Sequence, residues 1–194
     1  FKWTDESFMA NKSKCFDKPL NIYEMHLGSW MMKPAERIED RWHTYEELSS
    51  MLPDYLVEQG YNCVEFMPLS EHPVDISWGY QNTGFFSPTS RYGTPYQLNT
   101  LIDALHAKGI YVLMDFVPVH FATDNYALIN FDGTPLYENI RFNNGYSEWG
   151  SMNFDFSKGI VRSFLQSCAS YWMDVFHFDG MRIDAVSRMI YNNG

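Results

Sequence analysis

The sequence predicts an α/β fold in which four short β-rich runs alternate with three helices, as in a series of βα units. Two observations lead to this prediction. The apolar runs have the length of strands and end in polar residues, and the stretches between them carry apolar residues at helical spacing. Parallel strands joined in this way need right-handed crossovers, which pack the helices against the sheet.

The predicted strands are expected to be buried and parallel. The third and fourth each carry a dense apolar stretch that ends in polar residues, a pattern typical of a buried parallel strand with functional groups at its carboxyl end. We expect the four strands at residues 21–27, 62–69, 111–118 and 178–186.

Two of the predicted helices begin with a capping box, in which a Thr is followed three residues later by Glu or Gln. These boxes begin at Thr44 and Thr94, and Gly60 and Gly109 are expected to end the two helices. Pro53 is expected to split the first helix in two, because proline has no backbone N–H to donate. The third helix has an apolar stripe over roughly four turns, formed by Val161, Phe164, Leu165, Cys168, Trp172 and Phe176.

Such a series can close in two ways, as an open doubly wound sheet or as a (β/α)8 TIM barrel. No GxGxxG or GxxxxGK[ST] motif follows any strand, which removes the nucleotide-binding argument for an open sheet. Four βα steps are about half of a barrel of ~250 residues. We therefore expect residues 21–194 to form the first half of a barrel, strands 1–4, with a long loop at about 119–157. Residues 1–20 are polar and are expected to form an irregular linker from an upstream module.

Composition excludes several classes of partner. The chain has 14 Lys and Arg against 24 Asp and Glu, a net charge of −10. This acidic balance, with no Lys/Arg cluster, argues against nucleic acid and anionic membranes as partners. No stretch is apolar enough to span a bilayer. Cys15, Cys63 and Cys168 have neither CxxC nor His spacing for a metal, and they predict unpaired thiols in a reducing, cytoplasmic compartment.

Aromatic residues make up 18% of the chain. Rings fill cores, and they also provide the flat faces on which sugars stack. The loop after the second predicted strand combines Trp78 and Tyr80 with Gln81, as expected of a stacking platform at the rim of an active site. The alternative is an aromatic cluster packed under a long loop, which is the more common role of any single ring.

Polar side chains follow the third and fourth predicted strands. The third ends with Asp115 and His120, and the fourth with Arg182 and Asp184. Residues two apart in a strand point to the same side, so Arg182 is expected beside Asp184. An arginine next to a carboxylate keeps that carboxylate ionised, as a nucleophile requires. A structural ion pair at a strand end is an equally good interpretation of this pattern taken alone.

Two of these runs resemble signature regions of the α-amylase superfamily of retaining glycosidases and transglycosylases. They are the run from Asp115 to His120 and the run Asp179-Gly180-x-Arg182-x-Asp184. Longer strings at 22–30, 71–95 and 131–138 resemble the bacterial-type 1,4-α-glucan (glycogen) branching enzymes in particular. The resemblance covers essentially the whole chain from residue 20 onward.

The resemblance implies an enzyme that cuts an α-1,4-glucan and transfers the cut end to a 6-hydroxyl to form an α-1,6 branch. It implies that Asp184 is the nucleophile and that Arg182 keeps it ionised. It further implies that Tyr80 stacks on the sugar at the cleavage point, that His120 binds this sugar, and that Asp115 supports the arginine. Trp78 and Gln81 are expected to contact the glucan as well. No cofactor is implied.

The sequence departs from the family pattern in two ways. Val119 stands where many α-amylases have a calcium-binding asparagine, so we expect no metal at that place. The position of the family's general acid glutamate lies beyond Gly194, so the chain is expected to be an inactive fragment that self-associates through exposed barrel edges. A glucan hydrolase of the same superfamily and a non-catalytic glucan-binding module are the alternatives.

Overall fold

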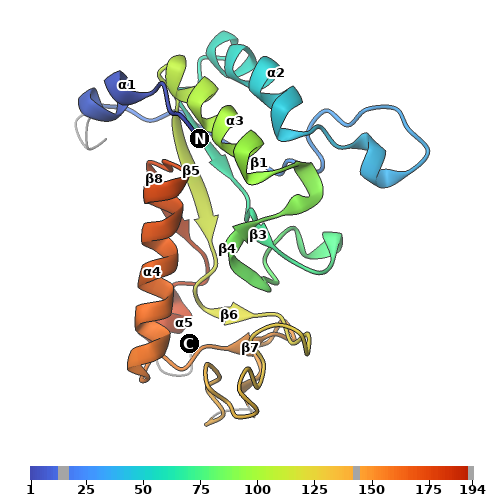
Figure 1. The fold of residues 1–194 in the computed structure, drawn as a ribbon, viewed down its shortest axis with the longest axis vertical. Coiled ribbons are helices and arrows are strands. Elements are labelled where there is room, and N and C mark those ends of the chain that lie inside the picture. The colour runs from blue at the N-terminus through green and yellow to red at the C-terminus, as the bar shows by residue number, and fades with distance from the viewer. Residues whose placement is uncertain (13–17, 142–144, 192–194) are drawn as a thin grey trace.

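The computed structural model describes residues 1–12, 18–141 and 145–191. Its centre is a parallel sheet of four strands, β1 (Ile22–Met25), β2 (Cys63–Phe66), β5 (Tyr111–Phe116) and β8 (Gly180–Ile183). The strands lie in the sheet in the order in which they follow along the chain (Figure 1). The α/β class with a parallel sheet is therefore confirmed, with strands shorter than the sequence predicted.

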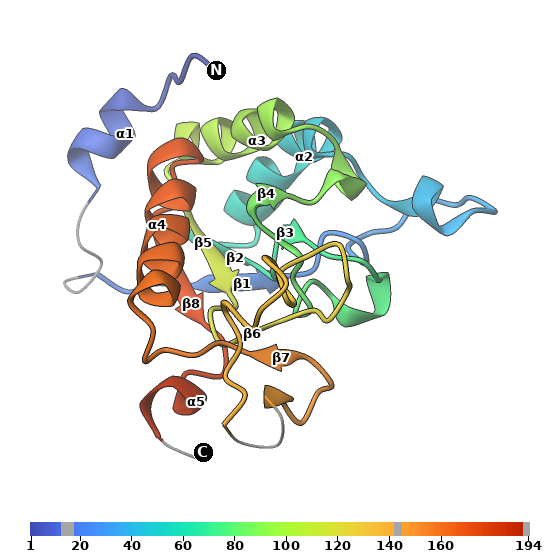
Figure 2. The same ribbon diagram turned by 60° about the horizontal axis from the view of Figure 1, so that its bottom comes forward.

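Three helices cover the sheet: α2 (Tyr45–Glu58), α3 (Pro95–Ala107) and α4 (Gly159–Val175). Neighbouring strands follow each other in the chain, so right-handed crossovers place these helices on one side of the sheet (Figures 1 and 2). Both predicted capping boxes are present, with Thr44 paired to Glu47 and Thr94 to Gln97.

The predicted split at Pro53 is wrong, because α2 runs through this residue without a break. Its buried face carries Leu48, Leu52 and Leu56, which are fully enclosed by the core. Burial of such side chains stabilises by about 1.5–3 kcal/mol each. Together they outweigh the ~3 kcal/mol that proline costs inside a helix.

The two faces of the sheet differ in polarity. Val64 and Phe66 of β2, with Val112 and Met114 of β5, are fully buried in the hydrophobic core. The alternate positions carry Glu24, Glu65, Asp115 and Arg182, and they share the opposite face because side chains in a strand alternate.

The predicted burial of the fourth strand is wrong. β8 is half-buried to exposed along its length, whereas β5 is mostly buried. Among the described strands, β8 pairs with β5 alone and is therefore an edge of the sheet. The edge position leaves the side chains of Arg182 and Ile183 open to solvent.

Two small antiparallel pairs extend beyond the carboxyl ends of the parallel strands (Figure 2). β3 (Ser70–Glu71) pairs with β4 (Gly84–Pro88), and β6 (His120–Phe121) pairs with β7 (Met152–Asn153). Short 3-10 helices span Ile38–Arg41, Asp75–Ser77 and Ser90–Tyr92, and a last short helix, α5, spans Ser187–Ile190.

The expectation that the N-terminal segment is irregular is wrong for helix α1 (Glu6–Asn11). Residues 1–12 are tied to the part of the chain that carries the sheet by a cluster of titratable side chains, most of them buried. Asp5 Oδ2 lies 2.8 Å from Nδ1 of both His106 and His177. His106 Nε2 lies 3.1 Å from Asp179 Oδ2, and Lys12 Nζ donates to Asp179 Oδ1 at 2.9 Å. We call these five residues the N-terminal clasp.

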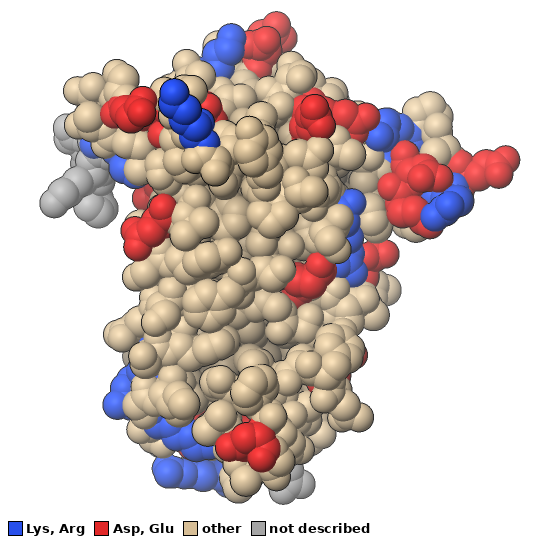
Figure 3. All heavy atoms as spheres, in the orientation of Figure 1, with Lys and Arg blue, Asp and Glu red and all other residues tan. Residues whose placement is uncertain are grey.

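Charged side chains of both signs are scattered over the face seen in Figure 3, and uncharged side chains cover most of its middle. None of the helices in the described segments has the length and apolar character needed to cross a membrane. Of the three cysteines, Cys15 lies outside the described residues, and the Cys168 thiol donates to the carbonyl of Phe85.

Candidate active site

The candidate site forms where β5 and β8 end side by side. Asp115 of β5 is in register with Arg182 of β8, so these side chains are cross-strand neighbours. Asp184 follows β8 directly, and its backbone N–H donates to the carbonyl of Phe116 at 2.9 Å. That bond fixes the position of Asp184 at the carboxyl edge of the sheet.

One guanidinium nitrogen joins the two carboxylates. Arg182 Nη1 donates to Asp115 Oδ1 and Oδ2 at 2.9 and 2.8 Å, and to Asp184 Oδ1 at 2.7 Å. Arg182 and Asp184 thus lie together, as their spacing in the sequence predicts. The hydrogen bonds to Asp115, with smaller effects from Asp184, raise the pKa of Arg182. The guanidinium is therefore a permanent positive charge beside Asp184.

Asp115 is the buried anchor of this group, with no exposed surface. Burial raises its pKa, opposed by hydrogen bonds from Tyr80 and Arg182. The Tyr80 hydroxyl donates to Asp115 Oδ2 at 2.6 Å. Burial and this bond to a carboxylate raise the pKa of Tyr80 far above its ordinary value, so the phenol keeps its proton.

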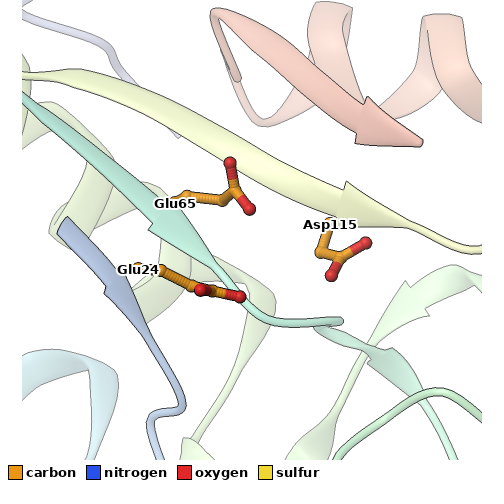
Figure 4. A group of neighbouring side chains, drawn as sticks. All are labelled: Glu24, Glu65 and Asp115. Atoms are coloured by element: carbon orange, nitrogen blue, oxygen red, sulfur yellow. The ribbon is translucent and has the colours of Figure 1, made fainter. Parts of the chain in front are cut away.

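Two further carboxylates lie beside Asp115 on the polar face of the sheet (Figure 4). Glu24, Glu65 and Asp115 come from neighbouring strands, and one oxygen of each lies within 4.8 Å of the others. Burial, with Asp115 and Glu24 nearby, raises the pKa of Glu65. These oxygens are the one group in the described segments that could hold a metal ion, although Arg182 already supplies Asp115 with a positive charge. At the position expected to lack calcium, Val119 is buried in the core.

His120 lies on β6, next to the charged group, and is almost fully buried. Burial lowers its pKa, with a smaller opposing effect of Asp184, so the imidazole is neutral near pH 7. Its Nδ1 has no hydrogen-bond partner among the described residues. That nitrogen is itself enclosed by the protein. A neutral imidazole can hydrogen-bond an uncharged hydroxyl group.

These residues surround an open cavity of about 350 Å³, which we call the central hollow. It is lined by Ser77, Tyr80, Gln81, His120, Trp149 and Asp184. Its volume is within the range of about 300–1,000 Å³ that is typical of small-molecule sites. Four residues predicted from the sequence thus share one cavity. Trp78 lies outside it, with 57% of its surface exposed.

Sequence reasoning missed Trp149. Its ring centroid lies 5.3 Å from that of His120, and its carbonyl accepts from Gln81 Nε2 at 3.5 Å. Trp149 belongs to the long loop after the third predicted strand. This loop has no periodic pattern of apolar residues from which the position of a side chain could be predicted. The only available signal was an aromatic residue within a loop already expected to lie at the active-site face.

The arrangement provides a carboxylate, a neutral imidazole and two aromatic rings around one cavity, with a permanent cation bonded to the carboxylate. A carboxylate oriented in this way can act as a nucleophile toward an electrophilic carbon. Rings and neutral polar groups suit an uncharged ligand rich in hydroxyl groups.

Comparison with known proteins identifies similar sequences and a similar fold. Residues 44–132 match the family model described as alpha amylase, catalytic domain. The chain is 49% identical to the 1,4-alpha-glucan branching enzyme GlgB 2 of Clostridium perfringens, in an alignment of 194 positions that covers 98% of this chain and 28% of that enzyme. It is 46% identical to the branching enzyme GlgB of Corynebacterium glutamicum, over 98% of this chain and 25% of that enzyme.

The resemblance to branching enzymes of the α-amylase superfamily is confirmed. A crystal structure of a Salmonella typhimurium protein, provisionally assigned as an α-amylase, superimposes with a TM-score of 0.78 at 27% identity. That match covers 100% of this chain and 30% of the solved one. The chain thus spans between a quarter and a third of the length of these relatives.

Proposed function

We propose that this chain is the nucleophile-bearing part of a 1,4-α-glucan branching enzyme, which cleaves an α-1,4 bond and transfers the chain to a 6-hydroxyl. One observation carries the proposal: Arg182 links buried Asp115 to Asp184 at the rim of a cavity that also contains Tyr80 and His120. The names of the curated relatives supply the reaction.

In the proposed reaction, a carboxylate oxygen of Asp184 attacks the anomeric carbon of a glucose unit in the central hollow. The bond from that carbon to the glycosidic oxygen breaks, and this oxygen takes a proton from a general acid. The 6-hydroxyl of an acceptor then attacks the same carbon, gives its proton to the same acid–base residue, and releases the Asp184 carboxylate. Two displacements retain the α configuration.

Each neighbouring residue has a role in this scheme. Arg182 keeps Asp184 ionised and oriented, and Asp115 holds the guanidinium in place. The Tyr80 ring forms a stacking face, fixed by its hydroxyl bond to Asp115. His120, in the wall of the central hollow, binds a sugar hydroxyl through its neutral ring, and Gln81 with Trp149 completes the wall.

The architecture that fits this function is the first half of a (β/α)8 barrel, with residues 1–20 leading in from an upstream module. A four-stranded parallel sheet in chain order, with helices on one side, supports this assignment. The family's acid and third carboxylate would come from outside residues 1–194. The chain alone is therefore expected to show neither branching nor hydrolysis, and turnover above that of Asp184→Asn would contradict this.

A glycosyl fluoride tests the nucleophile without requiring the acid, because fluoride leaves without being protonated. Incubation with maltotriosyl fluoride should form a bond between Asp184 and the anomeric carbon as the carbon–fluorine bond breaks and fluoride departs with the electron pair. Intact-mass spectrometry should show one added maltotriosyl group on the wild-type chain. Asp184→Asn should show none, and Asp174→Asn, on the exposed surface of α4, should react like the wild type. Equal labelling of Asp184→Asn would refute the assignment.

Glucan binding without catalysis is the rival function, because the rings of the central hollow fit it as well. It predicts that glucan affinity survives Asp184→Asn, is lost in Tyr80→Ala, and is accompanied by no covalent labelling. A hydrolase of the same superfamily would instead label at Asp184 and, in the full-length enzyme, give reducing ends without new α-1,6 bonds.

A further inference from the structure

The segment between β3 and β4, residues 72–83, carries Tyr80 into the wall of the central hollow, and we call it the Tyr80 loop. Its middle is strained, because Trp78 has φ 53°, in the left-handed region that a bulky side chain rarely adopts. The next residue, Gly79, packs so tightly that a Cβ there would clash with the carbonyl oxygen of Pro68. Such a turn persists only where the contacts around it hold it in place.

Arg91 follows the Tyr80 loop in the chain and binds the residues at which the loop begins. Its Nη1 donates to the carbonyl of His72 at 2.8 Å and to Glu71 Oε1 at 2.9 Å, and its Nε donates to Asp75 Oδ1 at 2.5 Å. The Arg91 side chain is 14% exposed, so water and salt screen these contacts less than they screen a surface ion pair. One guanidinium thus holds three neighbouring residues together.

Glu71 connects Arg91 to the far end of the loop. Glu71 Oε2 accepts from the N–H and the hydroxyl of Ser90, both at 2.9 Å, and Oε1 accepts from the Thr89 hydroxyl at 3.1 Å. Burial raises the pKa of Glu71, but its hydrogen bonds outweigh this effect and lower the pKa below its ordinary value. The Glu71 carbonyl also accepts from the N–H of Thr83 at 2.9 Å. Both ends of the Tyr80 loop are therefore fixed to the pair of Glu71 and Arg91.

Two hydrogen bonds link Asp75 to the stacking residue. The Asp75 carbonyl accepts from the N–H of Trp78, and the Ser77 carbonyl accepts from the N–H of Tyr80, both at 3.0 Å. Arg91 itself lies outside the wall of the central hollow. Its effect on a sugar in that hollow is therefore exerted through the loop.

We propose that Arg91 is a positioning residue: through Asp75 it holds Tyr80 where the ring can stack on the sugar to be cleaved. The inference rests on the proposed function and adds a residue outside the cavity on which the stacking face depends. The planar guanidinium reaches Asp75 and the start of the loop at the same time. A lysine ammonium has the same charge without this fixed geometry, so Arg91→Lys removes the geometry and keeps the charge.

The rate at which maltotriosyl fluoride labels Asp184, followed by intact-mass spectrometry, tests the proposal. Arg91→Lys should slow labelling by about 10–100-fold, because a misplacement of ~1 Å can cost about 100-fold in rate. Asp75→Ala breaks the same link from the side of the loop and should slow labelling to a similar extent. Arg37→Lys changes an exposed ion pair with Glu39 and should be labelled at the wild-type rate.

A double-mutant cycle distinguishes positioning of Tyr80 from other effects of Arg91. Tyr80→Ala removes the ring that the loop positions, so adding Arg91→Lys to this variant should slow labelling by less than about twofold further. A general loss of structure, or a direct contact of Arg91 with the sugar, would instead multiply the two effects.

Hydrogen exchange provides a second readout that needs no reaction. The amides of Trp78 and Tyr80 should exchange faster in Arg91→Lys than in the wild type, and those of α3 should be unchanged. Unchanged exchange in the loop, unchanged labelling of Arg91→Lys, or multiplied effects in the cycle overturns the inference. A wild-type chain that is not labelled at all refutes the proposed function instead, and exchange in the loop then still decides whether Arg91 holds Tyr80 in place.

Discussion

Replacing Asp5 by Asn should weaken the N-terminal clasp measurably. The Asp5 side chain is 1% exposed and lies 2.8 Å from both His106 and His177. Each hydrogen bond to a charged group contributes about 1.5–3 kcal/mol. In Asp5→Asn the amide oxygen can still accept one of the two hydrogen bonds, but it carries no charge. Removing one partner from a buried ion pair costs about 3–5 kcal/mol. Asp179 still contacts His106 in this variant. We therefore expect the free energy of unfolding to fall by about 3 kcal/mol, the lower end of that range.

Urea unfolding followed by circular dichroism measures this loss, and thermal unfolding should show a decrease of about 6–12 °C in a chain of this size. Glu6→Gln is the matched control, since it removes the neighbouring carboxylate, which is exposed on α1. Its unfolding free energy should stay within about 0.5 kcal/mol of wild type. Limited proteolysis should release residues 1–12 earlier from Asp5→Asn. If the free energy of unfolding of Asp5→Asn lies within about 1 kcal/mol of the wild-type value, the clasp is not a stabilising contact.

Three other predictions follow from the described contacts. Burial raises the pKa of Asp5, but hydrogen bonds from His177 and His106 outweigh it and lower the pKa below its ordinary value. Asp5 therefore contributes its full stabilisation of the folded state above the pKa of an unfolded aspartate, ~3.9. This contribution is lost as the pH falls through the lower pKa that Asp5 has in the folded state. The stability difference between wild type and Asp5→Asn should shrink in urea titrations towards that acid limit, and a constant difference would contradict this. Gly79→Ala should destabilise by clearly more than Gly60→Ala, since both have positive φ but only Gly79 meets backbone, at Pro68; equal thermal shifts would rule out the clash. Sedimentation velocity should show self-association, because β1 and β8 are edge strands among the described elements, and a monodisperse monomer would contradict it.

Local rules predicted much of the fold. The capping boxes at Thr44 and Thr94 formed as expected, because a cap depends on residues three apart. The contact between Arg182 and Asp184 follows from strand alternation in the same way. Pro53 failed as a break because three buried leucines outweigh its local cost, and no local rule includes that burial.

The candidate site was predicted unevenly for the same reason. Residues at strand ends were found because parallel strands bring their carboxyl ends to one edge. Trp149 was missed because a long loop without periodicity brings it to His120. A second cavity, lined by His26, His72 and Trp78 among others, likewise combines residues from the segments after β1 and β2, and only their packing shows that they share a wall.

By itself, the sequence determined the α/β class, the order of strands and helices, and the resemblance to branching enzymes. These depend on short-range spacing and on strings of residues. The tertiary structure alone decided which charges are buried together. Asp5 and His177, 172 residues apart, meet in the clasp, and Tyr80 closes on Asp115 across 35 residues. Contacts of this kind form because burying apolar surface brings distant segments together, and the buried charges must then find partners within the protein.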